Sequence, residues 1–200
     1  MRNFFWIFII LLNFGCKNEN TDLHTALQDL KTAKVKDPKK LTIPEACQMI
    51  SDAKLKEILK IKAPSVNLIN ATDPQSPGAK SCFFKWEDAN TPNAGILIQL
   101  QTNPVFDQYE DYFSKFVVSK LSEGETTLGD EKPSVYKKFN AGGVDGVYSF
   151  QQARFYWNYG NNYLVMLAMN VTTLSENQMV SAAEEIALEI NKTFVSQVNL

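Results

Sequence analysis

The chain has 200 residues, of which 44% are hydrophobic and 21% charged, a composition that is typical of globular proteins and unlike that of disordered or collagen-like chains. Its formal net charge is −2, and the sequence has no basic stripe or patch, so we expect no binding to nucleic acid. After removal of an N-terminal signal and a tether, about 160 residues remain, which fits one domain with a single core.

The first fifteen residues, 1–15, have the anatomy of an export signal. Arg2 supplies a positive start, an almost unbroken apolar run extends from Phe4 to Phe14, and a small residue comes directly before Cys16. This run of about eleven residues is roughly half of what an α-helix needs to cross the ~30 Å hydrocarbon layer of a membrane. We therefore expect the segment to be a removed signal peptide and not a membrane-spanning helix.

Cys16 closes a segment that resembles the lipobox of bacterial lipoproteins, namely Leu11-Leu12-Asn13-Phe14-Gly15-Cys16. In that family the cysteine sulfur receives diacylglycerol, and a dedicated peptidase cuts just before it. The resemblance implies a protein that is held in the cell envelope, at the outer membrane or the cell surface, by a lipid on Cys16. In the alternative interpretation, the segment is an ordinary secretory signal and Cys16 is incidental.

The cysteine count favours lipidation. An exported chain with three cysteines has one left over, and a lipidated Cys16 removes it from the count. Cys47 and Cys82 then remain as a natural pair. In an oxidising compartment their disulfide would close a loop of about 35 residues and stabilise the fold by about 3–4 kcal/mol. The alternative is a pair of buried thiols.

A tether and one folded domain follow the signal. Residues 16–40 are polar, rich in lysine and poor in large apolar side chains, which predicts a flexible tether. Residues 41–200 contain helical and strand patterns throughout, and we expect them to form a single α+β domain.

Apolar residues at helical spacing predict four helices in this domain, over residues 42–50, 51–59, 107–121 and 176–194. The first begins with a capping residue and an early proline, both of which favour a helix start. Cys47 lies in this helix and Cys82 in the strand that follows, so their disulfide would join the helix to a sheet.

Short apolar runs, several with strict alternation, predict about six strands, which we expect to form a mainly antiparallel sheet with the helices packed against it. Their expected ranges are 81–87, 94–102, 134–140, 146–151, 153–159 and 163–170. The turn Gly160-Asn161-Asn162 joins the last two strands as a hairpin.

Four segments are similar to those of small exported lipoprotein domains of unknown function. They are Ala46-Cys47-Gln48-Met49-Ile50, Cys82-Phe83-Phe84-Lys85-Trp86, Gly143-Val144-Asp145-Gly146-Val147-Tyr148 and Tyr159-Gly160-Asn161-Asn162-Tyr163-Leu164-Val165. Such domains resemble the PsbP/Mog1-like sandwich of a mainly antiparallel sheet with helices against it. The resemblance implies this fold in a Bacteroidota-type envelope lipoprotein, with a role in sensing or binding and not in catalysis.

The sequence has no pattern typical of a catalytic or metal site. Its only histidine, His24, lies in the predicted tether, so neither a Ser-His-Asp nor a Cys-His arrangement can form inside the domain, and His-ligated zinc is excluded as well. The glycines of residues 141–146 lack the helix and the Lys-Ser/Thr pair of a phosphate-binding loop. We therefore expect no metal, no cofactor and no catalytic residue.

The best candidate for a binding surface is the aromatic strand 153–159. Its alternation sends three aromatic side chains into the core and turns the others to the second face of the sheet. If that face is open, it offers an aromatic and polar patch, shared with the preceding strand, for a sugar, a peptide or a partner protein. The alternative is ordinary aromatic packing between strands. The candidate residues are Tyr148, Phe150, Arg154, Tyr156 and Asn158.

Three functions follow as hypotheses. The first is a non-enzymatic, membrane-tethered binding or accessory domain with an envelope protein or a glycan as its partner. The second is a hydrolase or other enzyme that acts on envelope polymers, and the third is an immunity or inhibitor lipoprotein with a tight protein partner. An enzyme would have a concave pocket lined by acids with perturbed pKa values, whereas a binding module would expose an aromatic patch.

Overall fold

The computed structural model describes residues 34–126 and 131–197, so the predicted signal peptide, Cys16 and most of the predicted tether lie outside the described residues. Within these ranges the chain forms one antiparallel sheet of seven strands in the order β1-β2-β3-β7-β6-β5-β4. The predicted α+β class is confirmed, with one strand more than the six expected. The strands are β1 (Asn67–Asn70), β2 (Ala79–Lys85), β3 (Gly95–Thr102), β4 (Lys137–Ala141), β5 (Val144–Ser149), β6 (Arg154–Tyr159) and β7 (Tyr163–Asn170).

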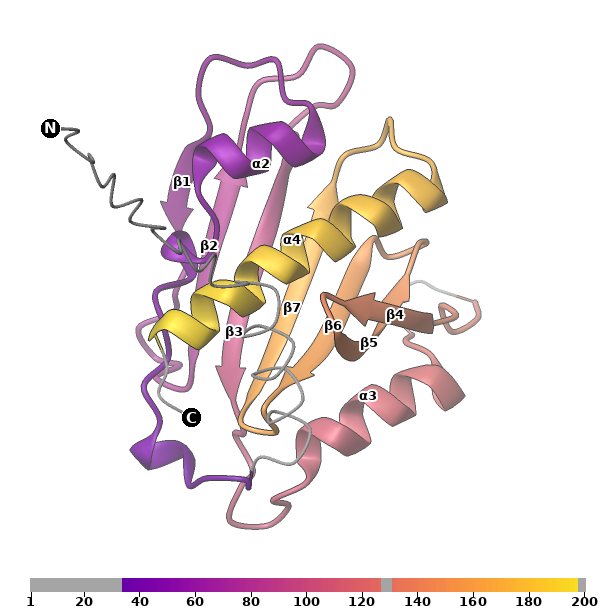
Figure 1. Ribbon diagram of the computed structural model, residues 1–200. Coiled ribbons are helices and arrows are strands. Elements are labelled where there is room, and N and C mark those ends of the chain that lie inside the picture. The colour runs from indigo at the N-terminus through magenta and orange to yellow at the C-terminus, as the bar shows by residue number, and fades with distance from the viewer. Residues whose placement is uncertain (1–33, 127–130, 198–200) are drawn as a thin grey trace, which may run out of the picture.

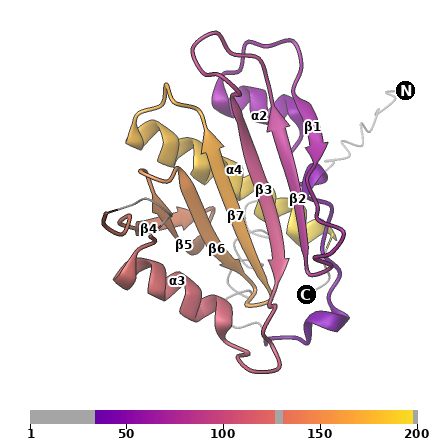
Figure 2. The same cartoon turned by 180° about the vertical axis from the view of Figure 1, so that it is seen from behind.

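Helices lie on both faces of the sheet. On the face turned to the viewer in Figure 1, here the front face, α4 (Glu176–Gln197) runs diagonally across the strands and α2 (Asp52–Leu59) lies above it. On the opposite face, the back face seen in Figure 2, α3 (Tyr112–Glu123) lies over one side only. Two 3₁₀ helices, η1 (Pro38–Lys40) and η2 (Ala46–Gln48), belong to the segment before α2. No helix within the described ranges is both long and apolar enough to span a membrane.

The main core lies between the front face and α4. The alternation predicted for β6 is confirmed, because Phe155, Trp157 and Tyr159 are all fully buried on this face. Tyr159 stacks on Phe194 of α4 with their ring centroids 4.3 Å apart. The long apolar stripe of α4 therefore packs against the largest side chains of the sheet.

One buried polar side chain joins α4 to the sheet. Asn191 is fully buried, and its Oδ1 accepts a hydrogen bond from Trp157 Nε1 at 3.1 Å while its Nδ2 donates to the carbonyl oxygen of Ala141 at 2.6 Å. The β4–β5 turn approaches the helix backbone closely at Gly142, where φ is +59° and an added Cβ would lie 2.6 Å from Leu188 Cα. Glycine therefore meets both the conformational and the spatial demands of this contact.

The segment before the sheet differs from the prediction. The helix predicted over 42–50 is wrong in extent, since only the 3₁₀ turn of η2 forms, and Glu45 before it is extended with φ −71° and ψ 116°. Pro44 lies at the break and disfavours helical conformation in the residue before it. The short helix after it is confirmed as α2, capped by the side chain of Ser51, which accepts from Lys54 N at 3.2 Å.

The helix predicted over 107–121 begins later, at Tyr112, because residues 104–110 form turns. The side chain of Asn103 holds these turns, accepting from Val105 N at 3.0 Å and donating to the carbonyl oxygen of Tyr109 at 2.7 Å.

Residues 34–42 are attached to one end of the sheet. The β6–β7 turn has left-handed conformations at Gly160 and Asn161, with φ of 60° and 55°, which glycine and asparagine tolerate best. The buried side chain of Asn162 accepts from Lys36 N at 2.6 Å, and the Tyr163 hydroxyl donates to the carbonyl oxygen of Thr42 at 2.9 Å. The described chain thus enters the domain beside this hairpin.

Candidate functional site

The five residues predicted as a binding face do not form one open surface. Tyr148 lies on the front face, where its ring stacks on Phe155 at 5.6 Å and its hydroxyl donates to Glu176 at 2.9 Å. Phe150, just after β5, is exposed. Arg154, Tyr156 and Asn158 alternate with the core residues of β6 and lie on the back face.

On the back face, α3 covers the part of β6 that the prediction left open. Tyr156 is only 6% exposed, and its ring makes an edge contact with Phe116 of α3 at 5.2 Å. Asn158 Nδ2 donates to the Ser114 hydroxyl of the same helix at 3.2 Å. The alternative stated for these residues, aromatic packing between strands, holds at Tyr148, which stacks on Phe155 of the neighbouring strand, whereas Tyr156 packs against the helix.

A charged cluster fixes the end of α3 to the sheet. Glu125, 18% exposed at its side chain, pairs with Lys120 at 2.9 Å and with Arg154 at 3.0 Å, and it accepts a hydrogen bond from the Tyr136 hydroxyl. The Lys120 ammonium also lies 5.0–5.5 Å from the ring centroids of Phe116, Tyr136 and Tyr156, within cation–π range.

These contacts set the ionisation of the cluster. Burial of Glu125 opposes its ionisation, but hydrogen bonds from Tyr136 and Lys120 and the charges of Lys120 and Arg154 outweigh burial and lower its pKa. Burial and the hydrogen bond to Glu125 raise the pKa of Tyr136. The cluster is therefore a carboxylate held between two cations beside a neutral phenol, which is a structural arrangement and not a proton donor.

We expect Glu125→Gln to destabilise the fold by about 1–2 kcal/mol at pH 7, because it leaves two partly buried cations without their counterion. Since the folded pKa of Glu125 lies below its ordinary value of 4.5, its contribution is complete well above that pH and is lost as pH falls through the folded pKa. Urea unfolding across pH 3–7 checks this (roughly the range in which a carboxyl group titrates). The variant's deficit should shrink in acid, and a deficit that is constant with pH would contradict the assignment.

The back face stays open over β2, β3 and the adjoining part of β7, as Figure 2 shows beside α3. Strand register aligns four apolar side chains there in a line across four strands. Ile69 and Phe83, at the β1 edge, are 47% and 41% exposed, while Leu97 and Ala168, further along the line, are partly buried. We call this line the apolar row; it consists of Ile69, Phe83, Leu97 and Ala168.

Two cationic side chains flank a shallow hollow of about 380 Å³ on the apolar row. Arg154 lies directly opposite Ala168 on β6 and continues the line, while Lys85 lies on β2 two residues beyond Phe83. Glu125 neutralises Arg154 in part, whereas no carboxylate of the described chain pairs with Lys85. The hollow is therefore apolar at its floor and positive at its rim.

A second, more polar hollow of about 490 Å³ adjoins the row on the same strands. Ser81, Gln99 and Gln101 contribute from β2 and β3, and the loop after β1 closes it with Asp73 and Ser76. Gln99 Nε2 donates to the Ser81 hydroxyl at 3.2 Å. Together the two hollows make this half of the back face, here the open half, a surface with one apolar and one polar section.

The open half offers apolar and cationic side chains. Within the described ranges, no three His, Cys, Asp or Glu side chains gather as metal ligands. The described carboxyl groups with shifted pKa values are Glu57, Glu125 and Glu176, and a hydrogen bond from a lysine lowers the pKa in each case. The apolar row can bury side chains of a partner, and Lys85 with Arg154 can pair with its carboxylates.

Of the residues that line the open half, only Arg154 was predicted from the sequence. Phe83 lies on the opposite face of the sheet from Cys82 and Phe84, and Leu97 lies on the opposite face from Ile96 and Ile98. These large apolar side chains on the outer side of two strands were the available signal. Whether these side chains are exposed depends on which helix covers the back face, and a strand pattern does not predict that.

No family model, curated protein or solved structure matches this chain. Its function must therefore be argued from the geometry described above.

Proposed function

We propose that this protein is a non-enzymatic binding or accessory lipoprotein of the cell envelope, anchored by a lipid on Cys16, and that it binds a partner protein through the open half. The observation that carries the binding proposal is the apolar row, which lies uncovered on the sheet beside Lys85 and Arg154. Contiguous apolar surfaces rimmed by polar groups mark interaction sites in soluble domains.

The row favours a protein partner over a glycan. It offers aliphatic side chains and the single phenyl ring of Phe83, which suit apolar side chains better than a sugar. The ammonium of Lys85, which pairs with no carboxylate in residues 34–126 and 131–197, calls for a carboxylate on the same partner. The partner we propose therefore presents apolar side chains next to an acidic residue.

The anchor and the export route form the second part of the proposal. The Cys47–Cys82 disulfide supports export, because such bonds persist in oxidising compartments. With these two cysteines paired, Cys16 is the one left for lipid. We also propose a relation to exported PsbP/Mog1-like lipoprotein domains, supported by the antiparallel sheet with helices against it.

Photocrosslinking of the full-length chain in the cells that produce it tests both parts. A photoreactive residue at position 97 should capture one stoichiometric protein in the membrane fraction. Lys85→Glu should lower that capture by about fivefold or more, which corresponds to ~1 kcal/mol of lost ion pairing. Cys16→Ser should move the chain from the membrane to the soluble fraction.

Position 150 is the control, because Phe150 is an exposed apolar residue of the sheet region that lies outside the open half. Equal capture from positions 97 and 150 would contradict the binding surface. A Cys16→Ser chain that stays in the membrane fraction would contradict the lipid anchor without touching the binding surface.

A further inference from the structure

The two edge strands of the sheet are protected differently. β4 carries Lys137 and Lys138, and α4 packs against it; charges and covering elements of this kind keep an edge from pairing with another strand. β1, at the other edge, reads Asn67-Leu68-Ile69-Asn70, without charge or proline, and all four residues are exposed. Among the described residues, its short length is the one protective feature of this edge.

Apolar side chains lie on both sides of the β1 edge. Leu68 is 46% exposed and pairs in register with Phe84 of the core, so it lies toward the front face. Ile69 is 47% exposed, pairs with Phe83 and lies toward the back face. The apolar row therefore runs to the open edge and ends there, where an added strand would cover Leu68 and Ile69 together.

We propose that β1 pairs antiparallel with β1 of a second copy of this chain, which joins the two sheets into one. A two-fold axis normal to the sheet sets the residue on the axis opposite its own copy and relates every other pair symmetrically. When Ile69 or Leu68 meets its own counterpart, side chains that share a face remain on that face, and in the Ile69 register the apolar row continues directly through both copies.

The charges before and after β1 suit this antiparallel arrangement. Lys62 lies five residues before the strand and Asp73 three residues after it, and both are exposed. Antiparallel pairing places the lysine end of one copy beside the aspartate end of the other, whereas parallel pairing would set like charges together. β1 has only four residues, so the paired strands bury less than a standard interface, and we expect a dissociation constant of roughly micromolar order.

Disulfide trapping in the intact chain tests the pairing. Ile69→Cys and Leu68→Cys report the two registers that the two-fold axis allows. On oxidation with copper phenanthroline, we expect one of the two to give at least about tenfold more covalent dimer than Val118→Cys, in line with its shorter Cα separation. Val118 is an exposed apolar residue of α3, and the unaltered chain reports any dimer formed through Cys16.

A second measurement needs no new cysteine. In sedimentation equilibrium of the intact chain in detergent, Ile69→Lys should raise the dimer dissociation constant at least about tenfold, and Val118→Lys should leave it unchanged. A chain that stays monomeric up to about 100 µM, or cysteine variants that trap no more dimer than Val118→Cys, would overturn self-pairing. Trapping of a different protein at position 68 or 69 would overturn it too, and would assign the edge to that protein. Because Ile69 also belongs to the apolar row, the results at Leu68, which lies toward the front face, separate self-pairing from binding at the open half, which is probed at positions 97 and 85.

Discussion

Asn191→Leu is expected to destabilise the protein by about 2–5 kcal/mol, because each buried group that loses its hydrogen-bond partner costs about 1–3 kcal/mol. The replacement is close in size, so it removes hydrogen bonds without opening a large cavity. It leaves the indole N–H of Trp157 and the carbonyl of Ala141 without their partner in a region where both Trp157 and position 191 are fully buried. Urea unfolding followed by tryptophan fluorescence measures the loss.

A double-mutant cycle with Trp157→Phe separates this effect from packing. Trp157→Phe removes the donor, so the hydrogen bond to Asn191 Oδ1 is absent in both single variants. The double variant should then lose less stability than the sum of the two, by about 1 kcal/mol or more. If the losses simply add, the Trp157–Asn191 hydrogen bond contributes nothing measurable, and the assignment of Asn191 as the link between α4 and the sheet is wrong.

The elements that the sequence predicts well are those with a long periodic pattern. β7 matches the predicted range 163–170 residue by residue, and α4 starts at Glu176 as expected. In both, one buried face extends over many residues, so the pattern is strong compared with any local propensity. β1 has four residues, is exposed throughout and is flanked by asparagine, so neither alternation nor an apolar run marks it as a strand.

The candidate site shows a different limit. The alternation of β6 is visible in the sequence, and so is the apolar stripe of the helix that follows β3. Which strands that helix covers depends on the chain path: α3 has 12 residues and packs over β5 and β6, so Tyr156 is buried and the β2–β3 half stays open. Register then aligns Phe83, Leu97 and Ala168. Neither the position of α3 nor this strand register follows from local patterns. Most of the predicted residues therefore lie away from the open half, and only Arg154 lines it.

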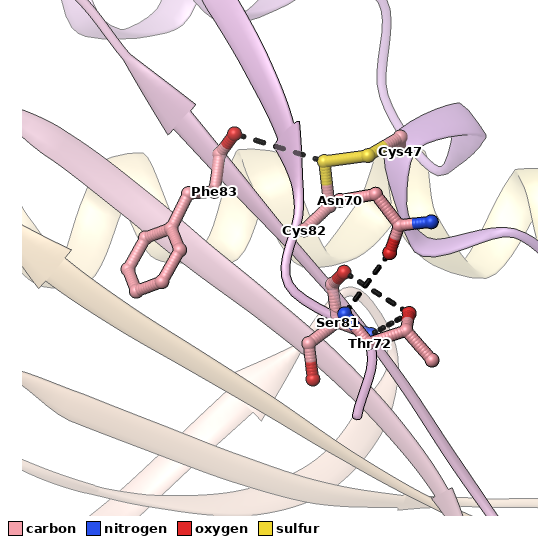
Figure 3. Close-up of a disulfide and its surroundings, with 6 residues drawn as sticks. All are labelled: Cys47, Asn70, Thr72, Ser81, Cys82 and Phe83. Carbon is pink, nitrogen blue, oxygen red and sulfur yellow. Dashed lines mark hydrogen bonds between the residues drawn. A yellow bond between two sulfur atoms is a disulfide. The ribbon is translucent and has the colours of Figure 1, made fainter. Parts of the chain in front are cut away.

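The Cys47–Cys82 disulfide predicted from the sequence is present, with its sulfur atoms 2.01 Å apart, and Figure 3 shows it on the opposite side of β2 from the Phe83 side chain. It fastens η2 to the strand that carries the middle of the apolar row. Beside it, the Thr72 hydroxyl accepts from Ser81 N at 3.1 Å and so closes the β1–β2 ladder.

Replacing both cysteines by alanine should destabilise the fold by about 4 kcal/mol, the chain-entropy value for a loop of the observed separation of 35 residues. Without the disulfide, the segment around η2 gains conformational freedom in the unfolded chain. The 3₁₀ helix η2 has only three residues and is too short to be stable by itself. Urea unfolding with and without a reducing agent measures the effect. The agent should lower the unfolding midpoint of the unaltered chain toward that of the Cys47→Ala, Cys82→Ala variant and leave the variant unchanged. An unaltered chain whose thiols are shown to be reduced but whose midpoint stays the same would mean that the packing of η2 against β2, and not the covalent bond, holds this edge of the sheet together.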